Sequence, residues 1–192
     1  MRGNIQVLET GNQRMVSLDL QSKLLQDNII MITDEIDTES VTDYQTQLFY
    51  LMSKLQSGDV ITLYINSPGG SVLDGLGLYD TIQLIKQKGI IIRTVNIGSA
   101  CSMASIILMS GSEGYRESTI NSSVLIHEVS AWWVGKTPDL LDQAEEIKRL
   151  QTILDGIISK HSDSQLIELC KRKDLWLNAE DSLKYHIIDK IL

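Results

Sequence analysis

Two short segments rich in glycine and serine could bring a nucleophile and backbone donors together. Residues 66–71 read Asn-Ser-Pro-Gly-Gly-Ser, and residues 98–105 read Gly-Ser-Ala-Cys-Ser-Met-Ala-Ser. Glycines in a strand-to-helix turn let backbone N–H groups approach a ligand near the positive end of a helix, and a serine held at such a junction can act as a nucleophile. Taken alone, 66–71 is more simply a plain turn, and close packing of small residues explains 98–105 about as well.

The nucleophile within the second segment is not fixed by the local pattern, which does not match GxSxG. The candidates are Ser99, Cys101, Ser102 and Ser105. His127 closes a short apolar run and is a candidate base, although a lone histidine in that position is more often structural. His161 and His186 stand in polar contexts at helix ends, which predicts that both are surface residues.

Strand-like and helix-like patterns alternate around these segments. The strand-like runs cover residues 28–32, 60–65, 90–97 and 124–126, and the helical periods cover residues 40–55, 71–86, 101–109 and 137–160. Ser40 with Asp43 indicates a capping box at the start of the first helix. Alternation at this spacing requires crossover connections, so it predicts an α/β fold with a mainly parallel sheet. In such sheets, catalytic groups gather at the carboxyl ends of the strands.

The helix predicted over residues 137–160 is long for a chain of this size. Thr137 is its candidate N-cap, and Pro138 suits the first helical position. About 24 residues at about 1.5 Å each give roughly 36 Å of helix. We expect self-association to cover its apolar stripe, with packing across its own sheet as the alternative.

Composition excludes several classes of protein. The chain has 192 residues, 43% hydrophobic and 22% charged, which predicts one compact globular domain, or one domain with appendages. Its net charge of −8 argues against a nucleic-acid partner. The longest apolar stretch is far shorter than the roughly 18 residues of a membrane span, and no secretory signal is visible. Two cysteines and three scattered histidines predict no disulfide framework and no metal site.

Four segments in order resemble the proteolytic-subunit family of the Clp protease. They cover residues 64–72, 79–83, 100–104 and 126–127, and the similarity extends from about Leu24 to Lys190. The resemblance implies an α/β superhelix of ββα units, shared with crotonases, with a mainly parallel sheet and a protruding handle helix at about 137–160. It implies an N-terminal arm over residues 1–20 that acts as an axial gate, and a single peptidase domain over residues 21–192.

The resemblance also implies the chemistry of a serine endopeptidase. Ser102 takes the position of the family's nucleophile, His127 that of the general base, and Asp174 that of the acidic member of the triad. The backbone N–H groups of Gly70 and Met103 match the family's oxyanion hole. This chemistry needs no metal and no cofactor in the chain itself.

The assembly implied by the resemblance is a homo-oligomer of two stacked heptameric rings. A hexameric AAA+ unfoldase, which uses ATP, feeds unfolded polypeptides to sites inside the barrel in the cytoplasm, or in a plastid stroma. The alternatives are a stand-alone processing protease of this fold, as in viral capsid maturation, a non-catalytic ring subunit, and a crotonase-type acyl-CoA enzyme. The intact serine, histidine and aspartate disfavour the last two.

Three features of the sequence after His127 differ from the family pattern. Glu128 and Val129 follow His127 where the family usually has Gln-Pro. Trp132 and Trp133 are expected to line a substrate groove or to fill a ring interface. His186 replaces a common glycine and predicts a left-handed helix C-cap.

Overall fold

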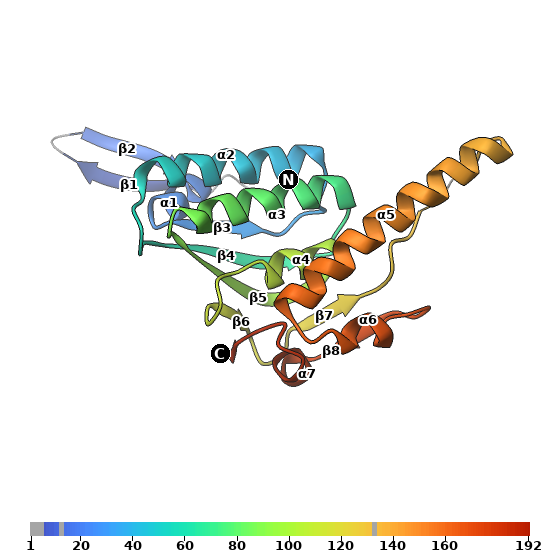
Figure 1. Cartoon of the computed structure of the whole chain (residues 1–192). Coiled ribbons are helices and arrows are strands. Elements are labelled where there is room, and N and C mark those ends of the chain that lie inside the picture. The colour runs from blue at the N-terminus through green and yellow to red at the C-terminus, as the bar shows by residue number, and fades with distance from the viewer. Residues whose placement is uncertain (1–5, 12–13, 132–133) are drawn as a thin grey trace.

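The computed structural model describes residues 6–11, 14–131 and 134–192. In that part of the chain, seven strands form one sheet (Figure 1). They are β3 (Ile29–Ile32), β4 (Val60–Ser67), β5 (Ile91–Cys101), β6 (Arg116–Ser118), β7 (Ser123–Ile126), β8 (Leu175–Leu177) and β9 (Lys190–Ile191). The order β3-β4-β5-β6-β9 is parallel throughout, and β7 adds to β5 in parallel and to β8 antiparallel. The predicted α/β class and mainly parallel sheet are therefore confirmed.

The helices of the described residues pack against this sheet and against each other. They are α1 (Leu20–Gln26), α2 (Thr38–Lys54), α3 (Val72–Gln87), α4 (Met103–Met109), α5 (Thr137–His161), α6 (Gln165–Leu169) and α7 (Ala179–Lys184). Helices α2 and α3 lie side by side, and α4 packs between α3 and α5 (Figure 1). Every residue of α4 is buried, so this short helix forms the centre of the core. Within the described ranges, no helix combines the length and the apolar character needed to cross a membrane.

Strand β5 is the longest strand of the sheet, and it is shared between two neighbours. Its middle, at Thr94–Asn96, pairs with β6, and its end, at Ser99–Cys101, pairs with β7. The strand therefore ends beside β7 just before α4 begins. This arrangement brings segment 98–105 next to the strand that precedes His127.

Two of the predicted N-caps are wrong, one by three residues and one by a single residue. Helix α2 begins at Thr38, because Asp37 accepts a hydrogen bond from Ser40 N at 2.8 Å and Ser40 Oγ accepts one from Asp37 N at 3.0 Å. The capping box is thus Asp37 with Ser40, and not Ser40 with Asp43. The N-cap of α5 is Lys136 and not Thr137, which is already helical.

Helix α5 divides into a buried half and an exposed half. Leu150, Leu154 and Ile158 on its second half are buried in the core. The first half extends away from the other elements, and Leu141 is 63% exposed (Figure 1). The predicted long helix is confirmed, at 25 residues. Apolar side chains on its outer turns, Leu140 and Leu141, are exposed to solvent.

The N-terminal segment, predicted to be an irregular arm, contains two strands. β1 (Gln6–Gly11) and β2 (Arg14–Asp19) pair antiparallel, and Figure 1 shows this hairpin extending from the end of α1. At the other end of the chain, His186 has φ 58°, which confirms its predicted left-handed backbone, although the C-cap of α7 is Tyr185 and His186 follows it.

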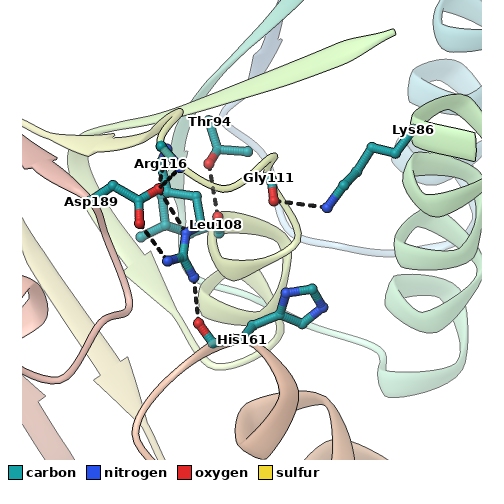
Figure 2. A network of polar contacts seen from close by, with 8 residues as sticks. Lys86, Thr94, Leu108, Gly111, Arg116, His161 and Asp189 are labelled. Carbon is teal, nitrogen blue, oxygen red and sulfur yellow. Dashed lines mark hydrogen bonds and ion pairs between the residues drawn. The ribbon is translucent and has the colours of Figure 1, made fainter. Parts of the chain in front are cut away.

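A polar network joins the end of α5 to the sheet (Figure 2). The Arg116 guanidinium, 8% exposed, forms an ion pair with Asp189 and donates to the carbonyl of His161. Lys86 donates to the carbonyl oxygens of Ser110 and Gly111 at 2.8 Å each, which neutralises the C-terminal end of α4. The C-terminal strand and α5 are therefore held to the core by charged groups.

The prediction that His161 is a surface residue is wrong. Its ring is half-buried, and Nε2 lies 2.8 Å from the Tyr79 hydroxyl. Burial, together with the charges of Lys86, Lys160 and Arg116, lowers the pKa of His161 to about 4. His186, by contrast, is exposed as predicted.

Candidate active site

Ser102 stands on a sharp turn between β5 and α4. It has φ 53° and ψ −123°, a conformation that side chains other than glycine rarely adopt and that costs about 1–3 kcal/mol. Its N–H donates to the carbonyl of Leu125 on β7 at 2.8 Å. A serine on a strained strand-to-helix turn presents its hydroxyl away from both elements, as nucleophilic serines of other α/β enzymes do.

The other three candidate nucleophiles are engaged or buried. Ser105 Oγ donates to the carbonyl of Ser102 at 2.7 Å, which is an ordinary helix contact. Ser99 Oγ bonds Asn66 Oδ1 at 3.2 Å. Cys101 is 8% exposed, and burial raises the pKa of its thiol, so the reactive thiolate is disfavoured. Of the four, Ser102 has the backbone geometry suited to attack.

A small cavity of about 60 Å³ brings several of the predicted site residues together. Ser102, Met103, His127 and Gly70 all line it. Apolar side chains from α4, β7 and α5 form much of the remaining wall, and they include Ile106, Ile126, Leu154 and Ile158. The cavity can therefore exclude water around a polar centre built from three separate segments.

The imidazole of His127 is held through its Nδ1 atom. Nδ1 lies 2.6 Å from the carbonyl oxygen of Glu128. A carbonyl only accepts, so Nδ1 carries the proton in this contact, and Nε2 of the neutral ring keeps its lone pair. That is the tautomer that a general base requires.

Asp174 lies across the β7–β8 ladder from His127, but it does not line the cavity. Ile126 pairs antiparallel with Leu175, and the next position along each strand holds His127 and Asp174. Asp174 is exposed, and the hydrogen bonds of the described residues include none between its carboxylate and the imidazole. In this arrangement the Glu128 carbonyl occupies the Nδ1 position that a triad aspartate would take.

The paired glycines face both the serine turn and a neighbouring loop. Gly69 has φ 87°, and a Cβ built on it would lie 2.4 Å from the carbonyl oxygen of Cys101 and 2.7 Å from Ser102 Cβ. A Cβ on Gly70 would lie 2.2 Å from the carbonyl oxygen of Ile36. Only glycine fits in either position, so the Gly-Gly turn is packed directly against the serine turn.

The segment after His127 is fixed from two sides by residues that the sequence analysis did not single out. The Glu128 carboxylate accepts a hydrogen bond from Arg172 N at 2.8 Å. Val129 N donates to Gln151 Oε1 at 2.7 Å. In the sequence, Gln151 could have been noticed as a polar residue in line with the apolar stripe of α5 that continues through Leu154 and Ile158. Trp132 and Trp133, expected to line a substrate groove or to fill a ring interface, lie outside the described residues.

No group of three or more histidine, cysteine or acidic side chains suited to a metal ion occurs in the described part of the chain. The fold and the cavity together define an α/β protein with a serine turn and a histidine facing one small apolar pocket.

Comparison with known proteins identifies the family. The family model for Clp protease matches residues 12–192. The ATP-dependent Clp protease proteolytic subunit of Bacteroides thetaiotaomicron is 37% identical over 191 residues, which cover 98% of this chain and 85% of that protein. The protein of the same name from Bacteroides fragilis is 37% identical and covered to 90%. The chain belongs to the Clp protease family, and the names of these relatives support peptidase activity.

Proposed function

We propose that this chain is the serine endopeptidase subunit of a Clp-type protease. Ser102 Oγ attacks the carbonyl carbon of a peptide bond while His127 Nε2 removes its proton. The tetrahedral intermediate collapses as the protonated imidazole gives that proton to the leaving amine, which leaves an acyl-enzyme. Water, activated by the same histidine, then releases the acyl group and restores Ser102.

The backbone conformation of Ser102 is the observation that carries this proposal. A strained φ in a non-glycine residue persists only where the surrounding structure enforces it, and such residues gather at catalytic sites. Here the hydrogen bond from Ser102 N to Leu125 and the glycine contact at position 69 enforce it. Neither Ser99 nor Ser105 has a comparable conformation.

Asp174 is the proposed third member of the triad. Its place across the ladder from His127 supports this role, because directly opposed residues of an antiparallel pair lie about 4.5–5.5 Å apart at Cα. From this position the carboxylate can act on the imidazole through its charge while Nδ1–H stays on the Glu128 carbonyl. The carboxylate stabilises the imidazolium that forms during attack.

The N–H groups of Gly70 and Met103 are the proposed oxyanion hole. Both residues line the cavity with Ser102, and Met103 is the first residue of α4, where the N–H has no partner within the helix. Donors of this kind stabilise the charge that develops on the carbonyl oxygen, and loss of one typically costs about 10²–10³ in rate.

The proposed assembly is two stacked heptameric rings in the cytoplasm, loaded with unfolded polypeptide by an AAA+ unfoldase that uses ATP. The outer half of α5 supports self-association, because its apolar residues Leu140 and Leu141 are 39% and 63% exposed. The hydrolysis itself requires no cofactor in this chain.

Labelling with a fluorophosphonate probe tests the catalytic proposal. The assembled protein is incubated with the probe, and the modified residue is located by mass spectrometry in wild type, Ser102→Ala and His127→Ala. We expect label on Ser102 that is lost in both variants. Label on Ser99 or Ser105 would contradict the assignment, and an unlabelled but assembled wild type would favour a non-catalytic ring subunit.

A further inference from the structure

A continuous chain of hydrogen bonds joins His127 to helix α5. His127 Nδ1 donates to the carbonyl oxygen of Glu128 at 2.6 Å, and Val129 N donates to Gln151 Oε1 at 2.7 Å. These two backbone groups belong to the same peptide unit. Gln151 Nε2 in turn donates to Asp155 Oδ1 at 2.7 Å. The chain therefore runs from the imidazole through one peptide group and one amide to a carboxylate.

The direction of each hydrogen bond in this chain is fixed by chemistry. A backbone N–H can only donate, so the Gln151 atom that faces Val129 is the amide oxygen. The Asp155 carboxylate can only accept when ionised, so the amide nitrogen faces it. Gln151 and Asp155 are one helical turn apart, which keeps them on the same face of α5. Hydrogen bonds aligned in this way polarise one another.

We propose that Gln151 is a positioning residue for His127, and that Asp155 acts through it. This inference rests on the proposed function. Gln151 holds the plane of the 128–129 peptide, whose carbonyl holds the imidazole in the tautomer with Nε2 free. Asp155 orients the Gln151 amide and polarises the chain toward the imidazole.

The surroundings of Gln151 support a role in the site. Gln151 lines the same cavity as Ser102 and His127, and it stands one helical turn before the buried Leu154. Gln151 is itself half-buried, so packing alone does not require an amide at this position. The amide instead supplies the acceptor for Val129 N–H, which follows β7 and has no partner in the β-ladder.

Kinetics of three variants test the proposal. Gln151→Met keeps the length of the side chain but removes both hydrogen bonds, and Gln87→Met makes the same change on an exposed glutamine at the end of α3. The double variant Gln151→Glu with Asp155→Asn, the exchanged pair, keeps both hydrogen bonds but reverses the one within α5. The new glutamate still accepts from Val129 N–H, and it now accepts from the asparagine amide instead of donating to a carboxylate. The readouts are the rate of fluorophosphonate labelling, kcat and KM for a peptide, and the pH dependence of kcat/KM.

We expect Gln151→Met to lower kcat and the labelling rate about ten-fold with little change in KM, since it weakens the alignment of the base and not the binding of substrate. The acidic limb of its pH profile should move to lower pH, because the imidazolium loses a polarised acceptor. Two carboxylates lie close to His127: Glu128 is next to it in the chain, and Asp174 lies across the β7–β8 ladder. Both are unchanged in every variant, so they do not account for a difference in the pH profile. Gln87→Met should match wild type.

The exchanged pair decides the outcome if Gln151→Met does not fold or assemble. Activity of the exchanged pair within about three-fold of wild type, with the wild-type pH profile, supports the proposal. A folded exchanged pair that is ten-fold or more slower than wild type overturns it, as does a folded Gln151→Met variant with wild-type kinetics. If wild type itself is not labelled at Ser102, the proposed function fails first.

Discussion

Ser102 donates its backbone N–H to the carbonyl of Leu125, two residues before His127, at 2.8 Å. This hydrogen bond continues the β5–β7 ladder, in which Cys101 pairs with Leu125. The proposed nucleophile and the proposed base are thus positioned by two neighbouring parallel strands. Their spacing of 25 residues in the sequence reflects the crossover through α4 that joins these strands.

The strain at Ser102 predicts that its removal stabilises the fold. Ser102→Gly should raise the free energy of unfolding by about 1 kcal/mol, which corresponds to a rise of about 2–4 °C in Tm, because glycine adopts φ 53° freely. Ser102→Ala keeps the Cβ and should give no such gain. Both variants should be inactive. Thermal unfolding checks this prediction, and equal Tm values for the two variants would contradict it.

The close approach of Gly69 to the serine turn predicts a large effect of a single methyl group. Gly69→Ala should lower the free energy of unfolding by about 3 kcal/mol or more and abolish labelling of Ser102, since the new Cβ would overlap the carbonyl of Cys101. Urea unfolding and the fluorophosphonate assay measure the two effects.

Gly58→Ala is the matched control for that substitution. Gly58 also has a left-handed backbone, at φ 95°, but no atom lies within 4 Å of the position where its Cβ would be. It should therefore cost only the backbone strain, about 1 kcal/mol, and leave labelling unchanged. Similar losses in both variants would show that strain alone, and not the contact with Ser102, determines the effect.

The buried ion pair at the end of the chain predicts a stability difference between two arginines. Arg116→Met should lower the free energy of unfolding by about 3–5 kcal/mol, because Asp189 would keep a partly buried charge without its partner. Arg149→Met breaks an exposed pair with Glu146 on α5 and should leave Tm unchanged. Chemical denaturation of both variants measures the difference, and equal stabilities would contradict the assigned role of Arg116.

Sequence patterns predicted the helices and strands whose conformation depends mainly on neighbouring residues in the chain. The run at 124–126 predicted β7 because three consecutive apolar residues ended at a polar histidine, and the alternation of strands and helices predicted the parallel sheet. His161 was misplaced because its neighbours in sequence are polar, whereas the Tyr79 ring that covers it comes from a helix far away in the chain. The local pattern alone did not separate Ser102 from Ser99, Cys101 and Ser105. The family resemblance selected Ser102, and its backbone dihedral angles support that choice. The role of Gln151 depends on a contact across 22 residues, which periodicity does not reveal.

The half-buried His161 predicts that stability falls on mild acidification. In the folded chain, burial and the nearby charges of Lys86, Lys160 and Arg116 lower its pKa to about 4, against 6.5 for an unperturbed histidine. Between these values the unfolded chain binds more protons, so the free energy of unfolding decreases as the pH falls from 6.5 to 4. The loss should be roughly 1–2 kcal/mol, less than the full linkage value because the ring remains partly accessible to solvent.

Comparison of two histidine variants separates this effect from general acid unfolding. His161→Gln, which can still accept from the Tyr79 hydroxyl, should flatten the stability curve between pH 6.5 and 4. His186→Gln, at an exposed position just after α7, should leave the wild-type slope. Asp189 affects stability only at lower pH. Burial by itself would raise the pKa of Asp189, but the hydrogen bonds from Arg116 and from Gly114 N lower this pKa below 3.8. The stability that the ionised carboxylate contributes is therefore lost only at still more acidic pH. Urea unfolding at pH 7.0, 5.5 and 4.5 therefore reports on His161. A wild-type slope in His161→Gln would show that the titrating group is not this histidine.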